Sequence, residues 1–222
     1  MRRVSHEAVS GIIAMIALGL VVNVLVMLTA LPLVLLLITT DPMRSWPLLA
    51  GAAVLAAPAV AAAFRAFREH AAGRLGPVRA FLAGLRDGWR LSLAVGALVV
   101  SVVVVLLVDV SLLAGSDLAV VTVPLLGVLT VLAVSVGLLA LVAVAEVPSA
   151  RLRDVLAASA VLALRRWYLT VVSLLIVATQ AALFVNLPAI GLGITASAAL
   201  YLAWANSRYA LRPVLRLDEV TA

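Results

Sequence analysis

Long, continuously apolar segments separated by short polar connections run through most of this 222-residue chain. Six of them are long enough to cross about 30 Å of hydrocarbon as helices, which takes roughly 20 residues each. Their approximate bounds are 11–38, 46–64, 91–113, 119–145, 168–186 and 189–207. Strands of a membrane β-barrel would instead alternate apolar and polar residues over about ten positions. The pattern therefore predicts an all-α, polytopic membrane protein with about six transmembrane helices in a single integral membrane domain.

The connection between the second and third spans has an amphipathic pattern over residues 78–90. On a helix of 100° per residue, Arg79, Arg86 and Arg90 fall within about 40° of one another. The apolar residues of the segment gather about a quarter-turn away: Val78, Leu82, Leu85 and Trp89. This pattern predicts a helix lying in the membrane interface, with its arginines reaching lipid phosphates or a partner protein and Trp89 at the level of the headgroups.

A weaker counterpart precedes the fifth span, in RLRDVLAASAVLALRRW, residues 151–167. Its apolar positions share one face of a helix: Leu152, Val155, Leu156 and Leu162. A second interfacial helix is therefore expected in this connection. The first junction, LRDGWRLSL, is faintly echoed by LRRWYLTVV at the second, as an internal repeat in a transporter would be.

Composition agrees with a membrane location. Hydrophobic residues make up 66% of the chain and charged residues only 12%, whereas a soluble domain carries roughly 25% charged residues. The mean hydropathy is +1.27. The chain has no cysteine, which excludes disulfides, thiolate metal ligands and cysteine nucleophiles.

The distribution of positive charge predicts the orientation of the spans. All 16 basic residues are arginines. In a six-span chain 15 of them fall on one side, in the two termini and the second-to-third and fourth-to-fifth connections: Arg2, Arg3, Arg65, Arg68, Arg74, Arg79, Arg86, Arg90, Arg151, Arg153, Arg165, Arg166, Arg208, Arg212 and Arg216. Only Arg44 falls on the other side. The positive-inside rule then predicts cytoplasmic N- and C-termini, and topology accounts for the basic charge without a nucleic-acid partner.

Four polar side chains inside the predicted spans are candidates for a functional site: Asn23, Asp109, Gln180 and Asn186. A buried amide in a span either joins two helices by hydrogen bonds or lines a path for a solute. Asp109 lies near the outer end of the third span, where it is either an interfacial acid or a proton-coupling carboxylate. Glu146, at the inner end of the fourth span, is placed to pair with an arginine.

The sequence lacks the usual signatures of an enzyme. His6 and Glu7 have no second histidine at the spacing of a zinc protease, and there is no phosphate-binding loop or glycine-flanked serine nucleophile. We expect no catalytic residues, no metal and no cofactor.

Three stretches resemble the YesL-like family of small bacterial integral membrane proteins, a family of unknown function. They are NVLVMLTALP (23–32), PAVAAAFRAFREHAAGRLGPVRAFLAGLRDGWR (58–90) and the late RLRDVLAASAVLALRRWYLTVV (151–172). The resemblance implies a multi-pass protein of the bacterial plasma membrane and an accessory part in carbohydrate uptake by ABC-type importers.

Two functions fit these observations. The first is a non-enzymatic accessory protein whose partners are membrane lipids and either ABC transporter subunits or further copies of itself. The second is a small transporter or channel, for which the polar side chains inside the spans would have to meet in one cavity.

Overall fold

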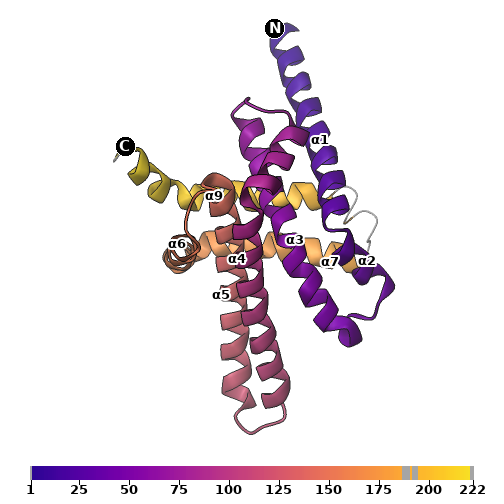
Figure 1. The fold of residues 1–222 in the computed structure, drawn as a ribbon, viewed down its shortest axis with the longest axis vertical. Helices are drawn as coiled ribbons and strands as arrows, with labels where there is room; N and C mark the ends of the chain where they lie inside the picture. Colours follow the sequence, from indigo (N-terminus) through magenta and orange to yellow (C-terminus); the bar gives the residue numbers. More distant parts are fainter. Residues whose placement is uncertain (1, 187–190, 192–194, 221–222) are drawn as a thin grey trace.

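The computed structural model describes residues 2–186, 191 and 195–220, and the side chains of 13–184, 191 and 195–211. The described residues form helices joined by short turns, without a strand. In chain order the helices are α1 (Arg2–Thr29), α2 (Leu31–Thr39), α3 (Pro42–Ala71), α4 (Pro77–Leu113), α5 (Ala119–Glu146), α6 (Leu152–Arg165), α7 (Trp167–Asn186) and α9 (Ala196–Val220), shown in Figure 1. Four of these, α3, α4, α5 and α7, are long and apolar enough to span a membrane, and the bent pair α1 and α2 supplies a fifth candidate. The prediction of an all-α polytopic membrane protein is confirmed.

The first predicted span, 11–38, is bent sharply rather than straight. The axes of its two parts, Ile13–Thr29 and Leu31–Thr39, differ by 77°. Pro32 occupies the first turn of α2, where it has no N–H to donate and where its ring would collide with the preceding turn of a continuous helix. The hydroxyl of Thr29 donates to the Leu25 carbonyl at 2.7 Å and so satisfies an acceptor at the end of α1. Proline is the cause of the bend, as helix chemistry predicts.

Small residues let α3 and α4 pack closely along their length. A Cβ added to Gly84 would lie 2.9 Å from the Ala62 Cα, and one added to Gly96 would lie 2.7 Å from the Ala57 Cβ. The buried face of α4 is made almost entirely of small residues: Ala80, Phe81, Gly84, Gly88, Ser92, Val95 and Gly96. Helices approach this closely in membranes because glycine and alanine leave room between the backbones.

The prediction of a separate interfacial helix at 78–90 is wrong, because α4 runs without a break from Pro77 to Leu113. The expected break from α3 is present, since Gly73 takes a φ of 64° that only glycine adopts easily and Pro77 begins the next helix. No second break occurs near residue 90, because the buried face of residues 80–96 continues to pack on its neighbours, on α3 at Gly84 and Gly96 and on α5 at Gly88. The arginine segment is the basic end of a spanning helix.

The second predicted interfacial helix exists as α6, but its apolar face covers protein rather than lipid. Val155 is buried in a cluster with Val95, Ala140 and Val144 of α4 and α5. The two junctions that echo each other in sequence also differ in structure: the first lies inside α4, whereas the second contains the break between α6 and α7 at Arg166.

The C-terminal helices α7 and α9 pack side by side and run crosswise to the α4–α5 hairpin in Figure 1. The bounds of α7 agree with the predicted span 168–186. The predicted span 189–207 begins outside the described residues, and α9 continues beyond its predicted end to Val220. Within the described part of the chain, α9 is not among the helices apolar enough to span a membrane.

The α3–α4 contact gives a direct test of the fold. Replacing Gly96 by valine forces atoms into Ala57, and overpacking of this kind costs about 1–3 kcal/mol of unfolding free energy. Gly127→Val in α5 is the matched control, because nothing lies within 4 Å of a Cβ added there. Thermal unfolding in detergent micelles should show a lower midpoint for Gly96→Val alone, and equal midpoints for the two variants would contradict this packing.

Candidate functional site

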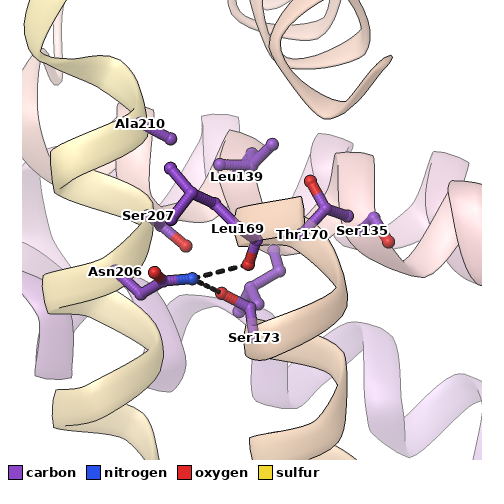
Figure 2. Close-up of a pocket in the computed structure, with 9 residues that line it drawn as sticks. Ser135, Leu139, Leu169, Thr170, Ser173, Asn206, Ser207 and Ala210 are labelled. Atoms are coloured by element: carbon purple, nitrogen blue, oxygen red, sulfur yellow. Dashed lines mark hydrogen bonds between the residues drawn. The ribbon is translucent and has the colours of Figure 1, made fainter. Parts of the chain in front are cut away.

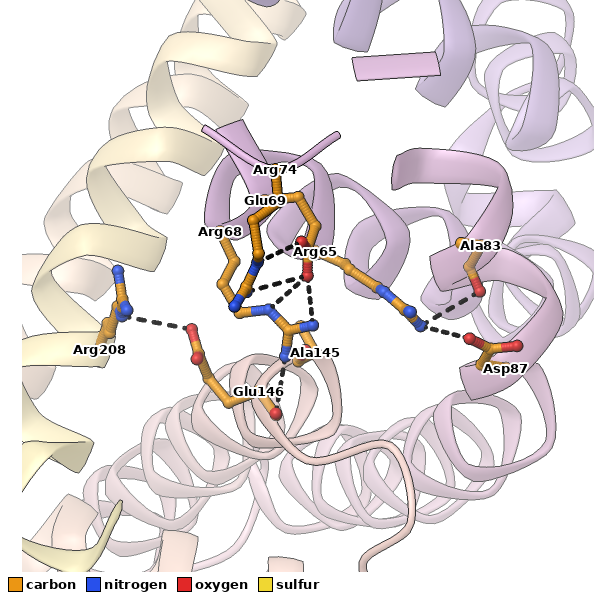
Figure 3. A network of polar contacts seen from close by, with 9 residues as sticks. All are labelled: Arg65, Arg68, Glu69, Arg74, Ala83, Asp87, Ala145, Glu146 and Arg208. Carbon is orange, nitrogen blue, oxygen red and sulfur yellow. Dashed lines mark hydrogen bonds and ion pairs between the residues drawn. The ribbon is translucent and has the colours of Figure 1, made fainter. Parts of the chain in front are cut away.

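A network of charged side chains joins four helices at one end of the molecule (Figure 3). Its members come from the end of α3, the loop after it, the basic half of α4, the end of α5 and the middle of α9: Arg65, Arg68, Glu69, Arg74, Asp87, Glu146 and Arg208. The sequence pattern predicted only the pairing of Glu146 with an arginine.

Glu69 is the acid at the centre of this network. Its side chain is 7% exposed and accepts hydrogen bonds from Arg68 Nη2 at 2.7 Å and Arg74 Nε at 2.9 Å. A buried carboxylate is tolerated only when it is paired and its oxygens are hydrogen-bonded. Both oxygens of Glu69 are satisfied here, so the pairing fixes the turn between α3 and α4.

The same Arg68 also closes the end of α5. Its Nη1 donates to the carbonyls of Ala145, at 2.5 Å, and Glu146, at 2.7 Å. The last carbonyls of a helix have no partner within the helix and attract cations. Arg68 therefore neutralises an acid of α3 and satisfies acceptors of α5 at once.

Two further pairs extend the network to α4 and α9. Arg65 Nη1 lies 2.7 Å from Asp87 Oδ2 and also donates to the Ala83 carbonyl at 3.3 Å. Arg208 Nε lies 3.5 Å from Glu146 Oε1, and its guanidinium stacks 5.2 Å from the centre of the Trp204 ring. These contacts place arginines from separate connections at one end of the helices.

Arg44 lies at the opposite end of α3 from this network. Arg44 is in the first turn of α3, 3.9 Å from Asp41, whereas Arg68 is in the last. Arg166, from the fourth-to-fifth connection, donates to the Tyr209 carbonyl of α9 at 3.2 Å, close in sequence to Arg208. The separation of arginines deduced from the charge count is thus present among the described side chains.

The amides inside the predicted spans join neighbouring segments. Asn23 is buried in α1 and its Oδ1 accepts from the Ser197 N–H at 2.6 Å, which satisfies a donor in the first turn of α9. Gln180 of α7 donates to the Gly191 carbonyl at 2.6 Å. These two amides therefore act at different helix contacts.

Of the other two candidates, only Asp109 has a described side chain. Asp109 lies one turn before the end of α4, is half-buried, and makes no hydrogen bond or ion pair with a described residue. The backbone of Asn186 ends α7, and its side chain lies outside the described side chains. Asn23, Gln180 and Asp109 do not converge on one cavity.

A polar cluster that the sequence pattern did not predict lies between α5, α7 and α9 (Figure 2). Asn206 Nδ2 donates to the Leu169 carbonyl at 2.6 Å and lies 2.8 Å from Ser173 Oγ. The cluster borders a cavity of about 10 Å³, roughly enough for one water molecule. The buried Ser207 hydroxyl also lines it and has no hydrogen-bond partner among the described residues. The sequence signal was an asparagine inside the run YLAWANSRY, close to the end of the sixth predicted span.

The predicted contact residues of α4 are exposed. Arg79, Arg86 and Arg90 form no ion pair with any described residue, unlike the arginines of the network. Trp89 is 46% exposed, and the guanidinium of Arg90 lies 5.4 Å from the centre of its ring. These side chains point away from the face of α4 that packs on α3.

Among the described residues, no group of three or more histidine, cysteine or carboxylate side chains is placed to hold a metal ion. The chemistry available at the basic end is therefore that of guanidinium groups, which bind phosphates and carboxylates.

Residues 19–110, from α1 into α4, match the model of a family described as a protein of unknown function, DUF624. No curated protein and no solved structure matches the chain. The matched region contains the first two stretches that resemble the YesL-like family, 23–32 and 58–90, and the basic half of α4. The match is consistent with that resemblance and carries no activity with it.

The network predicts unequal roles for two neighbouring arginines. Arg68→Gln leaves Glu69 with one cationic partner and removes the guanidinium donor from the carbonyls at the end of α5. We therefore expect a loss of about 3 kcal/mol in unfolding free energy. Arg74→Gln should cost less, because the Arg74 side chain is 60% exposed and water can take its place at Glu69 Oε2. Unfolding in mixed micelles compares the two, and equal losses would contradict the central position of Arg68.

The Asn206 cluster predicts a further stability effect. Asn206→Ala removes two hydrogen bonds between α7 and α9 and should cost about 1–2 kcal/mol. Thr179→Ala, at an exposed position of α7, should leave the unfolding midpoint unchanged. The same unfolding assay measures both, and an unaffected Asn206→Ala variant would mean that the contact does not hold the helices together.

Proposed function

We propose that this chain is a non-enzymatic accessory protein of the bacterial plasma membrane that acts by binding a transport complex. The observation that carries the proposal is the use of the in-span amides: Asn23 and Gln180 satisfy backbone groups of neighbouring segments instead of lining a shared cavity. A transporter or channel needs polar groups that meet along one path. The described arrangement supports helix packing as their role.

Uncovered apolar surface supports a role in binding. Trp167, Tyr168 and Leu175 of α7 are each more than half exposed, and α7 packs mainly on α9. In a membrane such a surface is available to lipid or to the spans of another protein. The resemblance to the YesL-like family favours a carbohydrate ABC-type importer as that protein, with the basic end in the cytoplasm.

Copurification tests the proposal. The full chain, tagged and extracted from its own membranes in a mild detergent, should carry a stoichiometric membrane partner that mass spectrometry identifies as an importer subunit. A tagged unrelated membrane protein of similar size, extracted in the same way, controls for nonspecific partners. A chain that reproducibly purifies alone would contradict the accessory role.

The transporter alternative has its own readout. The purified chain, reconstituted alone in vesicles, should give no saturable sugar uptake above that of empty vesicles. Saturable uptake that is lost in Gln180→Leu would favour the alternative.

A further inference from the structure

Because α4 is unbroken, its three exposed arginines, Arg79, Arg86 and Arg90, lie at different heights along one helix axis. On a helix that rises 1.5 Å per residue, Arg86 stands about 6 Å from Arg90 along the axis, and Arg79 stands about 16 Å from it. A helix lying flat in the interface would have kept all three at one depth. A helix that continues a span separates them.

Packing shows where the membrane boundary falls on α4. A Cβ added to Gly88 would lie 3.4 Å from Val144, which is two residues before Glu146 at the end of α5. Gly88 is thus level with the charged network, and the long apolar run of α4 begins directly after Arg90. The headgroup layer on each side of a bilayer is about 5–7 Å thick. Arg86 and Arg90 fit within that layer, whereas Arg79 stands outside it.

Arg86 and Arg90 are also arranged to share one anion. Residues four apart are neighbours on a helix surface, and two like charges there repel each other unless an anion lies between them. The nearest acid in sequence, Asp87, is held by Arg65 at 2.7 Å on the side that faces α3. Trp89, beneath the Arg90 guanidinium, adds an exposed aromatic ring of the kind that favours the headgroup level.

We propose that Arg86 and Arg90, with Trp89, form a binding site for the phosphate of one anionic lipid headgroup at the basic end of α4, and that Arg79 takes no part in it. A lipid phosphate is favoured over an acidic protein because the pair directly precedes the long apolar run of α4, beside the exposed Trp89 ring. The inference goes beyond the proposed function and does not depend on the transport partner.

Tryptophan quenching by brominated lipids tests the site. The full chain is reconstituted in phosphatidylcholine vesicles that contain either brominated phosphatidylglycerol or brominated phosphatidylcholine, and the signal of Trp89 is taken as the difference between wild type and Trp89→Phe. We expect an association constant about 30-fold higher for the anionic lipid, since each of the two arginines near a membrane surface contributes about 1 kcal/mol, or roughly fivefold. Arg86→Gln and Arg90→Gln should each lower the ratio to about fivefold.

Arg79→Gln is the matched control, since it removes the same charge from the same face of the same helix. It should leave the ratio unchanged. An equal loss in Arg79→Gln would overturn the depth assignment. Equal quenching by the two lipids in the wild type would overturn the site, and if Arg86→Gln also lost a copurifying protein, that result would assign the pair to an acidic partner.

Competition with inorganic phosphate distinguishes a lipid phosphate from a soluble phosphate as the ligand of the site. Inorganic phosphate and chloride, added to the outside and inside of the vesicles at equal ionic strength, should lower the ratio to the same extent, because both only screen the charges. A selective release of the anionic lipid by inorganic phosphate would overturn the lipid assignment in favour of a soluble phosphate ligand.

Discussion

The close approach of α3 and α4 is the constraint on which the rest of the structure depends. Ala57 and Ala62 on one helix meet Gly96 and Gly84 on the other, with no space for a larger side chain between them. In a bilayer the hydrophobic effect does not drive helices together, because lipid is as apolar as leucine, so contacts between backbones supply the attraction. Because the seam extends from Ala80 to Gly96, it supports α4 from its basic half into its apolar run.

The charged network also depends on the close packing of α3 and α4. The short turn after α3 brings Arg68, Glu69 and Arg74 together beside the end of α5. Removing charges from water costs several kcal/mol per ion, and an ion pair repays this only when hydrogen bonds satisfy its atoms. Arg68 meets that condition through one carboxylate and two carbonyls. The network therefore holds four helices together, and Arg68 supplies donors to carbonyls at the end of α5.

Sequence pattern predicted the membrane class, the helical fold and the bounds of α5 and α7, because these follow from hydropathy. It failed at residues 78–90, where an amphipathic pattern suggested a surface helix. The helical periodicity was right, but the glycines at 84 and 88 belong to a packing face, against Ala62 of α3 and Val144 of α5, which no one-dimensional pattern reveals. The Asn206 cluster and the partner of Asn23 could not be predicted either, since each joins residues far apart in the chain.

Because α4 is unbroken, its basic end and its apolar part move together as one rigid body. About 20 Å of this helix, from Pro77 to Arg90, precedes its long apolar run and continues it without a break. A change of about 10° in the tilt of the span would move the tip at Pro77 sideways by about 3 Å, because a helix without a hinge turns as one body. A change in bilayer thickness that the protein accommodated by tilting α4 would therefore displace the surface at its basic end.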